Sequence, residues 1–288
     1  MTGAGAVRGE RICGAFLAAL DGREVPVKLH SRFRGAANLS TPLGLFTLLS
    51  PGKCLQPYAV RLKEDMNFSS LEPGALTLGP GGLSRDGALA VSFAGAPAVD
   101  LHLPPGPAPR PEMAQAVRRF LACGPDEGLS RLALGRTDGP YAELLAPRLE
   151  ILRRAVRAGD AAAAARAAGR MAGCGPGLTP SSDDLICGYI SLRPAHDTWE
   201  AMATAIAEAA AAGTNDISAA LLTRAGEGCF SEDVLCLLAC LRGGAEGAEL
   251  TAALLRVASF GSSSGYDFLT GVYFGVLDAC AIGGIRID

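Results

Sequence analysis

The stretch Leu103–Met113, LPPGPAPRPEM, divides the chain into two parts of different character. Proline fixes its own φ angle and has no backbone N–H, so a run this rich in proline neither continues a strand nor joins a helix. We therefore predict a linker over residues 106–112, a first domain over residues 1–105 and a second over residues 113–288.

The first part contains short apolar runs that are separated by glycine, proline and aspartate. Their alternation of apolar and polar residues, with turn residues between them, predicts short strands of a small barrel or sandwich. The runs are VPVKLH (25–30), LGLFTLL (43–49), YAVRL (58–62), GALTLG (74–79), GALAVSFAG (87–95) and AVDLHL (98–103).

The second part has apolar residues at three- and four-residue spacings, in segments that end in glycine. This pattern predicts a larger, all-α domain with short connections, and the fold class is then α+β. Helices are expected within residues 142–159, 160–175, 198–213, 216–228, 231–244 and 248–261.

Composition excludes several classes of protein. The 288 residues are 49% hydrophobic with a mean hydropathy of +0.26, but no apolar run reaches the roughly 18 residues of a membrane-spanning helix. The N-terminus lacks a signal-peptide pattern, so we expect a cytoplasmic protein. A net charge of −3 argues against nucleic-acid and membrane-surface partners, and the apolar composition suggests a homo-oligomer.

The cysteines and histidines do not suggest a metal site. Nine cysteines are scattered without a CxxC pair, and the three histidines are isolated. Zinc sites need clustered ligands, and an odd number of scattered thiols fits a reducing compartment.

The segment Gly173–Asp184, GCGPGLTPSSDD, combines backbone freedom, hydroxyl groups and negative charge. Thr179 followed by proline predicts a helix start, with the threonine as cap and the proline in the first turn. A glycine-rich loop that leads into a helix N-terminus can bind an anion, while Asp183 and Asp184 suit the helix dipole. The alternative is a capped helix with no ligand.

A second segment, Gly261–Gly275 (GSSSGYDFLTGVYFG), repeats this pattern. Asp267 precedes Gly271 by four residues, as Asp184 precedes Gly188. Two helices that cross at these glycines would bring both loops toward one cleft. A purely structural helix pair is the alternative.

A third polar helix start, with Thr214, Asn215 and Ser218, lies between them. Three hydroxyl-rich helix starts in one domain predict a converging polar pocket, although each alone also fits a capped, solvated first turn.

These three segments together resemble the AllH-like family, a domain-of-unknown-function family that includes a subunit of anaerobic oxamate carbamoyltransferase. The segments KLHSRFRGAANL (28–39), GLFTLL (44–49) and PYAVRL (57–62) are similar to the opening of that family. The resemblance extends over residues 27–275 and is loose between 65 and 140. Where the family usually has a glycine before the first aspartate, this chain has Ser182.

The resemblance implies that oxalurate and phosphate give oxamate and carbamoyl phosphate, in anaerobic allantoin or purine nitrogen catabolism, with partner subunits. Asp183 or Asp184 would act as a base or hold a Mg²⁺ ion; no other cofactor is expected. The candidate residues for binding phosphate and a carbamoyl compound are Gly175, Gly177, Thr179, Ser181, Ser182, Thr214, Asn215, Ser218, Ser263, Ser264, Asp267, His30 and Asn38.

Three functional hypotheses stay open at this point. The chain is the active part of a carbamoyltransferase, an accessory subunit that binds a small anion or carbamoylated ligand for a partner enzyme, or a structural scaffold. Turnover without partners would indicate the first, and ligand binding without turnover the second.

Overall fold

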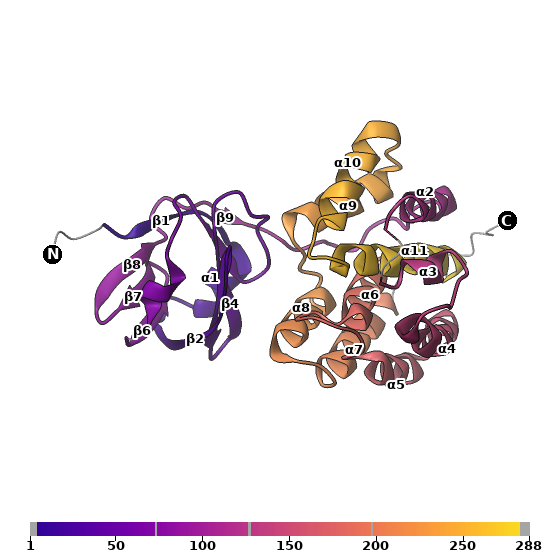
Figure 1. The fold of residues 1–288 in the computed structure, drawn as a ribbon, viewed down its shortest axis with the longest axis horizontal. Helices are drawn as coiled ribbons and strands as arrows, with labels where there is room; N and C mark the ends of the chain where they lie inside the picture. Colours follow the sequence, from indigo (N-terminus) through magenta and orange to yellow (C-terminus); the bar gives the residue numbers. More distant parts are fainter. Residues whose placement is uncertain (1–4, 73, 126–127, 197, 283–288) are drawn as a thin grey trace. The chain divides into compact units, whose positions relative to one another are not determined.

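The computed structural model describes residues 5–72, 74–125, 128–196 and 198–282. Internal contacts divide the chain into two compact units, residues 1–101 and residues 102–288 (Figure 1).

The first unit is a closed β-barrel. Its sheet has the order β5-β4-β3-β2-β6-β7-β8-β1-β9, and an antiparallel pairing of β1 with β5 closes it. The pairings of β1 with β8 and β9 and of β4 with β5 are parallel, and the others are antiparallel. The strands are β1 (Val7–Cys13), β2 (Val25–Phe33), β3 (Ala36–Thr41), β4 (Gly44–Leu49), β5 (Ala59–Leu62), β6 (Leu76–Gly79), β7 (Gly82–Arg85), β8 (Ala88–Ser92) and β9 (Ala98–Val99).

Aromatic side chains fill part of the barrel interior. Helix α1 (Gly14–Leu20) buries Phe16, whose ring centroid lies 4.1 Å from that of Phe46 on β4. The predicted β-rich domain is confirmed, and each of the six predicted runs contains a strand. The apolar runs gave no sign of β1, β3 and β7, because these strands are short or carry polar residues at alternate positions and are specified by their neighbours.

The second unit is all-α, as predicted. Pro111 and Glu112, which the sequence placed in the linker, already belong to α2, because proline is well tolerated in the first helical turn. The helices are α2 (Pro111–Ala122), α3 (Ser130–Ala133), α4 (Pro140–Arg157), α5 (Ala161–Met171), α6 (Ser181–Ile190), α7 (Trp199–Ala211), α8 (Asp216–Gly226), α9 (Glu232–Gly243), α10 (Gly247–Ala258) and α11 (Ser264–Ile282).

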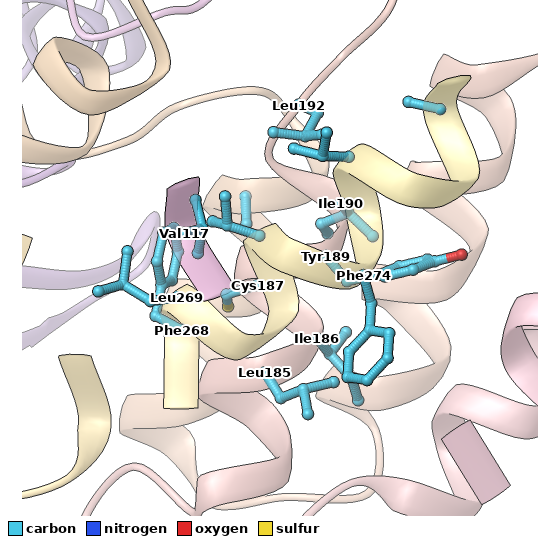
Figure 2. Close-up of a cluster of buried hydrophobic side chains, with 14 of the residues drawn as sticks. Val117, Leu185, Ile186, Cys187, Tyr189, Ile190, Leu192, Phe268, Leu269 and Phe274 are labelled. Carbon is cyan, nitrogen blue, oxygen red and sulfur yellow. The ribbon is translucent and has the colours of Figure 1, made fainter. Parts of the chain in front are cut away.

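Helices α6 and α11 cross at their glycines, and this confirms the prediction from the repeated pattern. A Cβ atom added to Gly188 would lie 2.0 Å from the carbonyl oxygen of Phe268, and one added to Gly271 would lie 2.0 Å from that of Leu185. Figure 2 shows the apolar side chains of both helices packed together at this crossing. The glycines therefore allow backbone contact, which brings the two helix starts together.

In the described ranges, no helix is both long and apolar enough to cross a membrane.

Candidate functional site

The loop that precedes α6 has the backbone form that its glycines predicted. Gly173, Gly175 and Gly177 have φ angles of 73°, 130° and 95°, a region that side-chain-bearing residues rarely adopt. The backbone N–H groups of Gly175, Gly177 and Leu178 donate to no acceptor among the described residues. The loop therefore presents several backbone donors that a ligand can use.

Thr179 does not cap α6, which corrects the prediction. Helix α6 begins at Ser181, and Pro180 occupies the capping position in an extended conformation, with φ −54° and ψ 140°. The hydroxyl of Thr179 instead lies 2.9 Å from that of Ser264, the first residue of α11. A contact between helix starts thus takes the place of a cap within one helix.

Asp183 is fully buried and holds the loop against α8. Its Oδ1 accepts hydrogen bonds from the backbone N–H of Gly173, at 2.8 Å, and from the hydroxyl of Ser182, at 3.2 Å. Its Oδ2 accepts from the hydroxyls of Thr214 and Ser218. Both oxygens are therefore occupied by the protein itself.

Asn215 completes the contact between α8 and the loop. Its side-chain oxygen caps α8 by accepting from the N–H groups of Ile217 and Ser218, and its amide donates to the carbonyl oxygen of Leu178 at 3.0 Å. The starts of α6, α8 and α11 thus converge. Capping of α8 and convergence of the helix starts are compatible, because Asn215 contributes to both.

Asp184 lies at the meeting of α6 and α11 and is only partly exposed. Burial raises its pKa from 3.8 to about 8; the nearby hydroxyls of Ser264 and Thr179 act in the opposite direction, and the charges of Asp267 and Asp183 add to the rise. Its Oδ2 is buried with no donor in hydrogen-bonding geometry. At neutral pH this side chain is therefore largely a protonated acid.

Asp267 lies at the start of α11 and is completely buried. Its Oδ1 accepts the backbone N–H of Leu129 at 2.6 Å, whereas Oδ2 is buried with no donor in hydrogen-bonding geometry. Burial raises its pKa to about 6, although the bond from Leu129 and the nearby hydroxyls of Ser181 and Ser263 lower it. Asp267 is thus the more acidic of the two carboxyls.

Ser182, which stands where the family usually has glycine, is an ordinary helical residue without a positive φ. Its hydroxyl accepts the N–H of Cys174 at 2.9 Å, and its own N–H donates to the carbonyl oxygen of Cys174. The serine therefore ties the loop to the helix.

His30 and Asn38, two predicted binding residues, belong to the β-barrel unit. The buried side chain of Asn38 donates to the hydroxyl of Ser31 and accepts from that of Thr47. A ring nitrogen of His30 lies 3.1 Å from the same Ser31 hydroxyl. Their assignment to the anion site stays a prediction.

The thiols near the site are not activated. Burial, which the charge of Asp183 reinforces and that of Arg148 opposes, raises the pKa of Cys174. Burial and the charges of Asp184 and Asp183 raise the pKa of Cys187 well above its ordinary range. Over the described residues, no group of three or more histidines, cysteines, aspartates or glutamates is placed to hold a metal ion.

No sequence pattern identified Leu129 or Arg148 as neighbours of the site. Leu129 contributes only its backbone N–H, and Arg148 acts through its charge from the middle of α4. Neither belongs to a motif, so only the fold could place them. A separate surface groove of about 520 Å³ between α2 and α10 contains none of the predicted site residues.

Residues 171–276 match the family model described as oxamate carbamoyltransferase subunit AllH. This segment is therefore similar to the AllH family. The AllH segment includes the loop before α6 and the starts of α6, α8 and α11, whereas the N-terminal part of the resemblance lies outside it. No curated protein and no solved structure matched the chain.

Proposed function

We propose that this chain is a subunit of an oxamate carbamoyltransferase and that its AllH segment holds the reacting groups. The reaction transfers a carbamoyl group between oxalurate and phosphate, with oxamate and carbamoyl phosphate as the other pair, in anaerobic nitrogen catabolism of the allantoin and purine type. One feature carries the proposal: a partly exposed aspartic acid, Asp184, whose pKa burial raises to about 8, lies beside a loop with unused backbone donors.

The loop suits the phosphate. Backbone N–H groups in a glycine-rich loop before a helix bind phosphate through the helix dipole and through direct hydrogen bonds. Such groups are supplied by Gly175, Gly177 and Leu178. The side chain of Thr179 adds a hydroxyl just before the start of α6. Asp183 does not repel the ligand strongly, since four donors surround its carboxylate.

The proton of Asp184 suits the leaving group. A phosphate oxygen attacks the ureido carbonyl carbon of oxalurate, a C–O bond forms and the C–N bond to the oxamate nitrogen breaks. That nitrogen is a poor leaving group as an anion, so Asp184 donates its proton to it and regains one from the attacking hydrogen phosphate. The same steps in reverse form oxalurate, and the proton balance closes in both directions.

The second candidate is an accessory role. The family description names a subunit, and the neighbouring thiols Cys174 and Cys187 are not activated as nucleophiles. In this case the loop binds phosphate or a carbamoylated ligand, and partner subunits complete the chemistry. The two candidates share the loop and differ in the role of Asp184.

The test is a thermal-shift series on the purified chain with phosphate, carbamoyl phosphate, oxamate and oxalurate, with and without Mg²⁺. A ligand at about 100 times its dissociation constant should stabilise the fold by about 2.7 kcal/mol. We expect phosphate and carbamoyl phosphate to stabilise the wild type, and Gly177→Ala to weaken this effect because alanine is strained at φ 95°.

Gly159→Ala is the matched control for that variant. Gly159 also has a positive φ, 71°, and open space around its Cα, but it lies between α4 and α5, outside the loop. Equal loss of ligand protection in both variants, or no protection of the wild type by any ligand, would reject the loop as the binding site. Turnover of oxalurate by the purified chain supports the first candidate, whereas binding without turnover supports the second.

A further inference from the structure

We infer that Asp267 is a positioning residue, a fixed second carboxyl behind Asp184 that keeps the proton of Asp184 in place. The inference deepens the proposed function and rests on it for the use of that proton. Asp267 then acts through Asp184 and does not touch the substrate, in contrast to the substrate-binding role predicted from the sequence.

The two carboxyl side chains differ in their accessibility to solvent. Asp267 is completely buried, whereas Asp184 is partly exposed between the hydroxyls of Thr179 and Ser264. A ligand in the loop can reach Asp184 but not Asp267. Burial of a carboxylate is also costly unless the group is hydrogen-bonded or paired.

The carboxyl of Asp267 is held firmly by the segment that precedes α3. The N–H of Leu129 reaches its Oδ1 at 2.6 Å, and a Cβ atom added to Gly128 would lie 2.3 Å from the same oxygen. Gly128 also has a φ of 62°. Glycine is therefore favoured at this position both by the backbone conformation and by the lack of space for a Cβ atom. The segment before α3 is therefore shaped around the carboxyl of Asp267.

Asp184 and Asp267 occupy equivalent positions on the crossing helices α6 and α11. The crossing at Gly188 and Gly271 places one aspartate on each helix, four residues before its glycine, at helix starts that the hydroxyls of Thr179 and Ser264 join. Each of them has a buried Oδ2 with no donor in hydrogen-bonding geometry. Two such neighbouring carboxyls do not both ionise readily.

The charged and titratable groups that face the pair are few. Asp183 on α6 and Asp267 on α11 act on Asp184, and the thiol of Cys187 feels the charge of Asp184. Groups near Asp267 are the N–H of Leu129 and the hydroxyls of Ser181 and Ser263, none of which is charged. The charge of Asp267 raises the pKa of Asp184 more than the charge of Asp183 does.

The experiment is a ¹³C NMR titration of the aspartate side-chain carboxyl carbons in the purified full chain. In Asp267→Asn, the amide oxygen can still accept the N–H of Leu129 while the negative charge is removed. We expect the titration of Asp184 to move to lower pH in this variant and to stay in place in the control Asp160→Asn. Asparagine also caps helices well, so the control preserves the start of α5, where Asp160 accepts the N–H of Ala163.

The wild type alone gives a second readout if Asp267→Asn does not fold. Asp267 should ionise first, and the carbon of Asp184 should respond to that step before its own titration. An Asp184 titration that is unchanged in Asp267→Asn, or that precedes Asp267 in the wild type, overturns the inference. Because NMR needs no turnover, a chain that shows the expected titrations but binds no phosphate would refute the proposed function alone.

Discussion

Two adjacent aspartates in the sequence have different surroundings in the fold. Asp183 points toward the loop and α8 and accepts hydrogen bonds from four donors. Asp184 lies beside α11, where burial raises its pKa to about 8. Consecutive helical positions lie about 100° apart around the axis, so neighbouring residues contact different elements. The side chain of the first aspartate is therefore held by the protein itself, and the second is the one to which we assign proton transfer in the proposed function.

Replacement of Asp183 tests this division at the residue scale. Asp183→Ala leaves the N–H of Gly173 and the buried hydroxyl of Ser218 without their partner, and we expect a loss of stability of about 3 kcal/mol. Urea unfolding at neutral pH measures it. Asp184→Asn serves as the comparison and should cost much less; an equal cost for both would contradict the division.

At the scale of elements, the crossing of α6 and α11 organises the site. The backbones approach where Gly188 and Gly271 lack side chains, and the helix starts then meet through the hydroxyls of Thr179 and Ser264. Close packing leaves no space for an added methyl group at such a contact. The glycines are therefore as important to the site as the residues that bear functional groups.

Gly188→Ala should destabilise the second unit by at least about 1–3 kcal/mol, because its Cβ would overlap the carbonyl of Phe268. The matched control is Gly243→Ala at the end of α9, where nothing lies within 4 Å of the added atom. Alanine is there expected to stabilise by about 0.5–1 kcal/mol. Thermal unfolding of both variants checks the pair, and a neutral effect at Gly188 would show that the helices can move apart.

At the scale of the whole molecule, buried ionisable groups link stability to pH. One pair is compensated: Asp278, buried on α11, accepts hydrogen bonds from Arg153 on α4 and from the hydroxyl of Tyr189 on α6. Burial acts to lower the pKa of Arg153, but the bond and charge of Asp278 outweigh it and raise that pKa. Asp184 has no such cation and remains protonated instead.

This difference predicts how stability depends on pH. The folded state keeps the proton of Asp184 up to about pH 8, whereas the unfolded chain releases it near 3.8, so the folded state binds more protons between these values. The contribution of Asp184 to stability is thus fully present below pH 3.8 and is lost as pH rises to about 8.

Urea unfolding of the wild type and of Asp184→Asn between pH 6 and 8.5 measures this effect. Asp267 has already ionised over most of this range, since its pKa is about 6. The stability of the wild type relative to the variant should fall by up to about 1.4 kcal/mol per pH unit, with the slope disappearing above pH 8. Parallel curves for the two proteins would show that Asp184 titrates at its ordinary pKa.

The sequence by itself determined the α+β class, the helical character of the second part and the crossing of α6 and α11. These features depend on local patterns: apolar periodicity, proline and glycine positions, and the repeated spacing of Asp184 with Gly188 and of Asp267 with Gly271. The sequence also drew attention to the three helix starts that the fold brings together. The sequence predicted the barrel less completely, because β1, β3 and β7 are specified by their neighbours in the sheet.

Only the tertiary structure decided the surroundings of each aspartate and what Thr179 contacts. Burial and partners from distant segments set these properties: Thr214 and Ser218 for Asp183, and Leu129 for Asp267. A pKa depends on desolvation and on charges within a few ångströms, and neither quantity is encoded in local spacing. Glycines and hydroxyl-bearing residues therefore indicate the candidate site in the sequence. The packing of the helices determines the environment of its carboxyl groups.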